Sequence, residues 1–172
     1  VYFLMIIDSK KENKEISKQY KELLRISYQT LSDSDKKMIR LAFDAAVDAH
    51  NGQRRKSGEA YIFHPISVAK IVASEIGLDA VSIAAALIHD VVEDNSNHTL
   101  ENIEKEFGKN ISKIVDGLTK IGKLNTKGYS DVSIQAENYR KMLLTLNEDV
   151  RVIIIKIADR LHNMQTLSSM AY

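Results

Sequence analysis

The sequence contains no cysteine and a single proline, and only seven of its 172 residues are glycine. The absence of cysteine excludes disulfide bonds and metal sites built on thiolates. The scarcity of proline and glycine removes the usual interruptions of helices, and most segments mix polar and apolar residues at helical spacing. We therefore expect an all-α protein that folds as a compact helical bundle.

The chain also lacks a strong charge of either sign. Its 24 Lys and Arg residues balance 23 Asp and Glu residues, which gives a formal net charge of +1. This balance argues against a general nucleic-acid binder, so DNA is not an expected partner. The apolar start VYFLMII is too short to cross a bilayer and lacks the basic region and cleavage site of a signal peptide. We expect no membrane partner and a cytoplasmic location.

The expected helices are marked by capping residues, by glycines that stop a helix and by apolar residues three and four apart. They cover residues 31–52, 64–77, 78–95, 99–108, 110–118, 133–146 and 148–167, with a loop over 119–130. VRVIIIKIA could form a strand by its β-propensity, but a helix is favoured because nothing else in the chain would pair with it.

We expect the chain to consist of two parts. Residues 1–30 form an N-terminal extension with a first helix, and residues 31–172 form one domain. The sequence ends at TLSSMAY without residues that stop a helix, as expected for a fragment of a longer protein.

The stretch AALIHDVVEDN places His89, Asp90, Glu93 and Asp94 in what the pattern predicts to be a buried helix. Ionisable groups beside an apolar stripe are costly unless something pairs with them. His89 and Glu93 would share a face, as would Asp90 and Asp94, whereas the neighbours His89 and Asp90 could reach one point only at a helix junction. A divalent metal would satisfy them, with oxygen ligands favouring manganese over zinc, and so would a hydrogen bond between His and Asp in the core.

Two further side chains could complete a metal site. His64 precedes Pro65, which predicts an extended His64 at the cap of the next helix, where ordinary capping is the alternative role. Asp159 follows VIIIKIA, which we expect to be buried, so this carboxylate needs a cation. The alternative is an ion pair with Lys156 or Arg160, although both are expected on other faces. With the adjacent His-Asp pair, these residues would form a site of two His and two Asp drawn from three helices.

A basic loop leads directly into this candidate site. In GQRRKSGEAYIFHP, the cations Arg54, Arg55 and Lys56 precede His64 by a few residues. Most such runs are simply solvated, but a basic loop tethered to a metal ligand could hold phosphates or stack on a base. A metal, carboxylates and cations in one place predict phosphate-ester chemistry.

Three stretches, GQRRKSGEAYIFHP, AALIHDVVEDN and IKIADRLHNMQTL, occur in an order and at a spacing that closely resemble the N-terminal hydrolase domain of the long RelA/SpoT (Rel) proteins of the HD superfamily. The resemblance covers roughly residues 31–167 and implies an α-helical bundle. It also implies manganese-dependent hydrolysis of the 3′-diphosphate of guanosine tetra- or pentaphosphate, (p)ppGpp, to GDP or GTP and pyrophosphate in stringent-response control. In those long proteins, a synthetase domain and regulatory domains follow and would be partners of this domain.

Transferred residue by residue, the resemblance implies three groups of site residues. The metal ligands would be His64, His89, Asp90 and Asp159. The acidic pair that positions and activates the attacking water would be Glu93 and Asp94. The positions of the nucleotide pocket would be Arg55, Lys56, Ser57, Asn163 and Thr166. Gln165 stands where Arg is usual, which removes a possible phosphate contact and affects only affinity.

Two other functions remain alternatives. One is a catalytically silent regulatory module that controls a partner domain, but degenerate members of this kind lose the His-Asp or Glu-Asp groups, and this sequence keeps them. The other is an HD phosphohydrolase that acts on deoxynucleoside triphosphates or cyclic nucleotides, which the RRKSGE loop disfavours.

Overall fold

The computed structural model describes residues 2–27, 31–94, 98–122, 140, 143 and 148–167. These residues form helices and no strand, although an isolated antiparallel bridge pairs Arg54 with Ala60. The helices are α1 (Tyr2–Ile26), α2 (Asp33–Ala49), α3 (Phe63–Ile71), the π-helical turn η1 (Val72–Ile76), α4 (Ala80–Leu87), α5 (Val91–Asp94), α6 (Leu100–Phe107), α7 (Lys109–Gly122) and α9 (Val150–Gln165). The prediction of an all-α bundle is confirmed.

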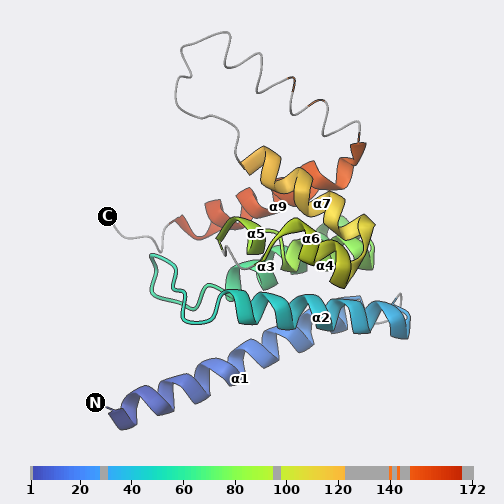
Figure 1. The fold of residues 1–172 in the computed structure, drawn as a ribbon. Helices are drawn as coiled ribbons and strands as arrows, with labels where there is room; N and C mark the ends of the chain where they lie inside the picture. Colours follow the sequence, from blue (N-terminus) through green and yellow to red (C-terminus); the bar gives the residue numbers. More distant parts are fainter. Residues whose placement is uncertain are drawn as a thin grey trace, which may run out of the picture.

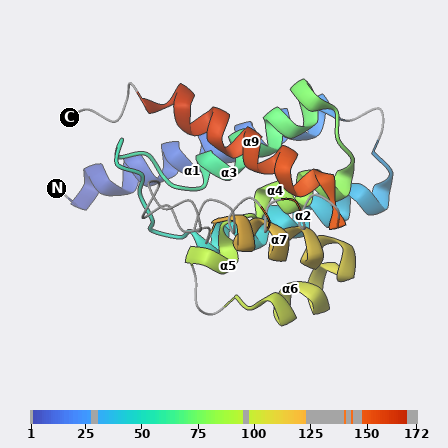
Figure 2. The same ribbon diagram turned by 90° about the horizontal axis from the view of Figure 1, so that it is seen from above.

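Helix α4 lies at the centre of the bundle. Seven of its eight residues are buried, and Val81 is the exception. It contacts α2, α3 and α7, and Figure 1 shows α1 and α2 on one side of it and α7 and α9 on the other. The view from above in Figure 2 shows α9 crossing the bundle close to α3. A helix that is apolar on every side is stable only when neighbours cover it all round, so α4 fixes where the surrounding helices lie.

Local signals in the sequence explain the first two helices. Ser32 caps α2 through a reciprocal capping box with Asp35, as expected for capping residues at the start of this segment. The buried face of α2 packs against α4, and Phe43 also stacks on Tyr20 of α1 with ring centroids 4.1 Å apart. Helix α1 agrees with the first helix expected within residues 1–30.

The helix expected over residues 78–95 is broken in two. Helix α4 ends at Leu87, Ile88 follows as its C-cap with φ −109° and ψ 15°, and α5 begins at Val91. Neighbouring residues on an unbroken helix point about 100° apart. The break releases His89 and Asp90 from this constraint, so both can turn toward one point.

His64 also departs from expectation. Helix α3 begins at Phe63, and its N-cap Ile62 already has helical angles of φ −54° and ψ −25°. His64 is therefore helical rather than extended, and its backbone N–H donates to the Tyr61 carbonyl at 2.9 Å. Pro65 is tolerated because amides in the first turn have no partner within the helix.

The C-terminal half confirms some expectations and corrects others. Helix α7 continues to Gly122, so residues 119–122 are helical where a loop was expected. The remainder of that loop and the helix expected over 133–146 lie outside the described residues, apart from positions 140 and 143. VRVIIIKIA is helical, as predicted. No helix among the described residues is both long enough and apolar enough to cross a membrane.

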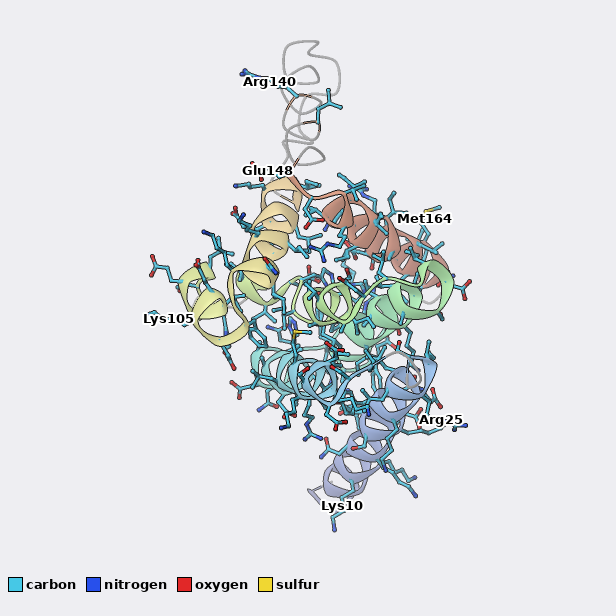
Figure 3. The ribbon with its side chains drawn as sticks, turned by 90° about the vertical axis from the view of Figure 1, so that its right-hand side faces the viewer. Lys10, Arg25, Lys105, Arg140, Glu148 and Met164 are labelled. Carbon is cyan, nitrogen blue, oxygen red and sulfur yellow. The ribbon has the colours of Figure 1, made fainter. Side chains whose placement is uncertain are left out.

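Helix α9 is apolar on two faces, which corrects the expectation that VIIIKIA is buried throughout. Val152 and Ile155 lie in the core, whereas Ile157, Leu161 and Met164 are 59%, 41% and 68% exposed. Figure 3 shows Met164 projecting outward from this helix. The residues of each set recur at helical spacing, so the buried set faces α3 and α7 and the exposed set faces away from them.

Candidate metal centre

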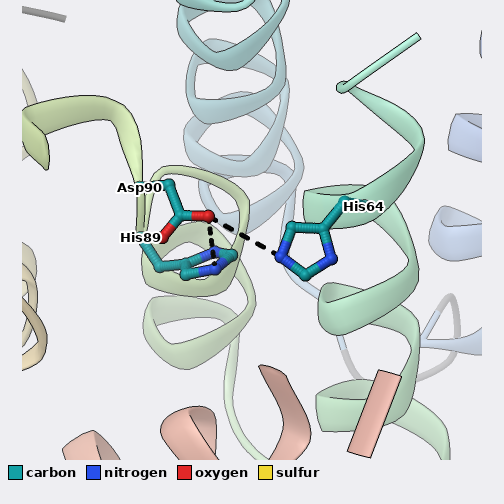
Figure 4. A group of neighbouring side chains, drawn as sticks. All are labelled: His64, His89 and Asp90. Carbon is teal, nitrogen blue, oxygen red and sulfur yellow. Dashed lines mark ion pairs between the residues drawn. The ribbon is translucent and has the colours of Figure 1, made fainter. Parts of the chain in front are cut away.

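Four side chains from three parts of the fold meet at one point. His64 comes from the first turn of α3, His89 and Asp90 come from the break between α4 and α5, and Asp159 comes from the buried face of α9. The ligand atoms of His64, His89 and Asp90 all lie within 4.8 Å of one another, and Figure 4 shows both imidazoles beside the Asp90 carboxylate. Asp159 Oδ1 lies 3.2 Å from His64 Nε2 and 3.9 Å from His89 Nε2. The structure thus brings together the four side chains expected as metal ligands.

The hydrogen bonds of His89 show that this cluster fits a cation. Its Nδ1 lies 2.7 Å from the carbonyl oxygen of Ala86, which can only accept, so Nδ1 carries the hydrogen. The other nitrogen, Nε2, is buried and has no hydrogen-bond partner among the described residues. It lies 3.0 Å from the charged Asp90 Oδ2, so in the neutral imidazole a lone pair would face this electron-rich oxygen. Two such atoms repel at this distance unless a cation or a proton lies between them, so the site fits a divalent metal.

The charges of the site reinforce this requirement. Burial would raise the pKa of Asp90, but His89, His64 and the Tyr61 hydroxyl, which donates to Asp90 Oδ2 at 2.8 Å, hold that pKa well below its usual range. Burial would also raise the pKa of Asp159, but His64, His89 and Lys156 hold that pKa well below its usual range. Both carboxylates are therefore charged at neutral pH, in a place where charge needs compensation.

Asp159 has protein partners of its own. Lys156 Nζ lies 2.8 Å from Asp159 Oδ2, and Asn163 Nδ2 donates to Asp159 Oδ1 at 2.8 Å. The expectation that Lys156 lies on another face is wrong, because residues three apart on a helix are neighbours. Arg160 is exposed. Lys156 compensates one oxygen of Asp159, and the other oxygen faces the two histidines.

The basic loop docks on the end of α9. The Arg55 side chain is 7% exposed, and its Nη2 donates to Asn163 Oδ1 at 2.7 Å. The loop turns where the Gly58 N–H donates to the Arg55 carbonyl at 2.8 Å, and Gly58 has φ +88°, a conformation that favours glycine. Lys56 and Ser57 are exposed at the tip of the loop. Of the residues expected in the nucleotide pocket, Arg55 and Asn163 are thus in contact, and Lys56 and Ser57 face solvent.

The remaining expected residues lie around this core. The Thr166 hydroxyl donates to the carbonyl of His162 at 3.0 Å, at the C-terminal end of α9. Glu93 is exposed, and its carboxylate lies against Gly122 of α7, where an added Cβ would come 3.0 Å from Glu93 Cδ. Asp94 is the last residue of α5, and its side chain lies outside the described part of the structure.

Sequence reasoning missed Tyr61 and His162. His162 Nδ1 lies 2.9 Å from His64 Nδ1 and 3.4 Å from Arg55 Nη1. Burial lowers the pKa of His162 to about 4, with electrostatic contributions from His64, Arg55 and, to a smaller extent, His89. His162 is therefore neutral at neutral pH. Its spacing of three residues from Asp159 on one helix was a usable signal. Nothing in the sequence marks Tyr61, because its contact depends on the turn before α3.

We expect metal binding to release a proton from His89. Burial alone would lower the pKa of His89, but Asp90 and Asp159 together raise it above the usual value. The metal-free protein therefore keeps this proton to higher pH than free histidine does, and a metal must displace it. Metal affinity should fall as the pH decreases from about 8 to about 6. Calorimetric titration in two buffers with different ionisation enthalpies measures the released proton, and an affinity independent of pH would contradict the assignment.

Residues 42–171 match the model of the HD domain family. Putative GTP diphosphokinase RSH1, chloroplastic, of Oryza sativa subsp. japonica is 48% identical over 150 residues, which are 84% of this chain and 16% of that protein. The bifunctional (p)ppGpp synthase/hydrolase SpoT of Escherichia coli (strain K12) is 46% identical over 140 residues, which are 81% of this chain and 19% of SpoT.

A solved structure agrees with these matches. It belongs to a metazoan ortholog of SpoT that hydrolyzes ppGpp and plays a role in starvation responses. The likeness has a TM-score of 0.62 at 29% identity and covers 81% of this chain and 73% of that one. The chain spans less than a fifth of the length of the two curated relatives described above, at 16% and 19%. These findings agree with the resemblance seen in the motifs, and the match over residues 42–171 shows that the chain belongs to the HD domain family.

Proposed function

We propose that this chain hydrolyses the 3′-diphosphate of (p)ppGpp, giving GDP or GTP and pyrophosphate, with Mn²⁺ as its metal and in stringent-response control. The observation that carries the proposal is the convergence of two imidazoles and two carboxylates at one buried point, next to a docked basic loop. The SpoT relative and the ppGpp-hydrolyzing structural neighbour support the choice of substrate. The compartment we propose is the cytoplasm, where guanosine nucleotides are found.

The metal ligands in this proposal are His64, His89, Asp90 and Asp159. The mixture of imidazole nitrogen and carboxylate oxygen suits Mn²⁺. When bound, a divalent cation supplies positive charge to the phosphate oxygens and lowers the pKa of water beside it. Asp90 is oriented for this task by the hydroxyl of Tyr61.

The reaction requires a water oxygen to attack the phosphorus atom bonded to the 3′ oxygen. The bond between phosphorus and the 3′ oxygen breaks, the water oxygen remains on pyrophosphate, and a proton reaches the 3′ oxygen. Glu93 and Asp94 are proposed to orient this water and accept its proton, because attack must occur in line with the departing oxygen. The exposed position of Glu93, one turn beyond the cluster, leaves its carboxylate accessible to substrate water.

The nucleotide is proposed to lie over the basic loop and the end of α9. Lys56 and Ser57 are exposed at the tip of the loop, where they would meet phosphate oxygens. Asn163 and Thr166 line the end of α9. The basic loop was expected to hold phosphates or stack on a base, but because the Arg55 side chain is 7% exposed, we assign Arg55 chiefly to holding the loop on α9.

The proposed partners are (p)ppGpp and, in a longer protein, synthetase and regulatory domains. A silent regulatory module remains an alternative function, as does an HD phosphohydrolase for other nucleotides. The assembled His and Asp cluster favours an active centre over a silent one.

The direct test is a ppGpp turnover assay with and without Mn²⁺. The wild-type chain should release pyrophosphate only with the metal, and Asp90→Asn should lose roughly 10²-fold or more in rate, because a charged ligand worth several kcal/mol is removed. Asp44→Asn is the matched control, since Asp44 lies on the exposed side of α2 and pairs with Arg40 at 2.8 Å. Hydrolysis of deoxynucleoside triphosphates but not ppGpp would contradict the substrate, and full metal binding without any turnover would indicate a silent module.

The acidic pair is tested separately from the metal. Glu93→Gln and Asp94→Asn keep the side-chain shape, so metal binding and the KM for ppGpp should stay close to wild type. Each change should lower kcat by roughly 10²-fold or more, the usual scale for loss of a general base. Glu101→Gln, on the exposed side of α6, is the control. Single-turnover rates near wild type in both amide variants would show that another group accepts the proton.

A further inference from the structure

His162 joins the basic loop to the candidate metal centre. It lies on α9, one turn after Asp159, and its ring centroid is 5.0 Å from that of His64 with the rings tilted by 41°. Its Nδ1 lies 2.9 Å from His64 Nδ1 and 3.4 Å from Arg55 Nη1. One nitrogen of His162 therefore faces both a proposed metal ligand and the arginine of the basic loop.

The chemistry of these three groups determines where the hydrogens lie. A guanidinium can only donate, so the His162 Nδ1 that faces Arg55 must accept. His64 Nδ1 lies 2.9 Å from the same atom and can therefore donate its hydrogen to His162. The other nitrogen of His64, Nε2, lies 3.2 Å from Asp159 Oδ1 and 3.6 Å from Asp90 Oδ2, and a metal bound there would take its lone pair in place of a hydrogen.

We infer that His162 is a positioning residue, which holds His64 in the tautomer that presents Nε2 to the metal and couples the docking of the basic loop to that ligand. The inference rests on the proposed role of His64 as a ligand. Histidines that bind metals generally donate their second N–H to a carboxylate, a carbonyl or water, and here the acceptor is a neutral imidazole. His89 follows the same rule with the Ala86 carbonyl as acceptor.

A second route runs parallel to the first. Arg55 Nη2 donates to Asn163 Oδ1, and Asn163 Nδ2 donates to Asp159 Oδ1. Arg55 therefore reaches His64 through His162 and reaches Asp159 through Asn163. A loop that holds phosphate at its tip is thus connected at its base to one imidazole and one carboxylate of the metal centre.

The test compares His162→Leu with His162→Asn. Leucine fills the space without an acceptor, whereas the asparagine carbonyl can stand near the position of Nδ1. With Zn²⁺ as a diamagnetic probe, ¹⁵N NMR should show His64 with its hydrogen on Nδ1 and the metal on Nε2 in the wild type and in His162→Asn. In His162→Leu, part of the His64 population should lack this Nε2-bound form at the same Zn²⁺ concentration. His98→Asn, before α6, is the control.

Metal titration provides the second readout. Mn²⁺ affinity should fall roughly 10- to 100-fold in His162→Leu, the scale for loss of a partner that orients a ligand, and should recover largely in His162→Asn. At saturating Mn²⁺, kcat for ppGpp should change much less than the metal affinity does. If His162→Leu keeps both the wild-type His64 tautomer and the wild-type affinity, or if His162→Asn is as impaired as His162→Leu, the inference is overturned.

These readouts separate the inference from the proposed function. A wild-type chain that binds Mn²⁺ but does not hydrolyse ppGpp, with the expected tautomer change in His162→Leu, would refute the substrate and support the inference. A wild-type chain that hydrolyses ppGpp, with an unchanged tautomer and unchanged Mn²⁺ affinity in His162→Leu, would refute the inference alone.

Discussion

The structure depends on positive charge at one buried point, where two imidazoles and two carboxylates converge. His89 turns Nε2, which has no hydrogen-bond partner in the part of the chain that the structure describes, toward the charged carboxylate of Asp90, and His64 and Asp159 approach the same place. Electron-rich atoms at such distances, removed from water, are stable together only around positive charge. Lys156 supplies part of this charge to Asp159 from the outside. A divalent metal would supply the rest at the centre.

Two local features of the helices bring these side chains together. The break between α4 and α5 lets two adjacent residues aim at one point, and the early start of α3 places His64 in a helical turn. The buried helix α4 is the rigid reference for both, because α2, α3 and α7 pack around it. Helix α9 contributes Asp159 on its inner face and His162 and Asn163 near its end, where the basic loop docks through Arg55. The ligands and the basic loop are therefore parts of one hydrogen-bonded assembly.

The sequence predicted the helical class, the capping of α2 and the four side chains that converge, because these depend on local chemistry and helical spacing. It predicted one continuous helix over residues 78–95, because the apolar periodicity is the same on both sides of Ile88. The only signal of an interruption was that His89 and Asp90 could reach one point only at a helix junction. It assigned Lys156 to another face, although spacing alone places that residue beside Asp159. It also missed His162, because a contact with His64 across almost a hundred residues depends on how α3 and α9 pack.

The measurement that tests the central claim most directly is pulsed EPR of the Mn²⁺-loaded chain, prepared once with natural-abundance histidine and once with ¹⁵N-histidine. The account predicts hyperfine coupling to two histidine nitrogens, both changing with the isotope, and loss of one coupling in His64→Ala with the other retained from His89. A spectrum without histidine coupling, or one unchanged by His64→Ala, would contradict a metal held at the junction of α3, α4 and α9.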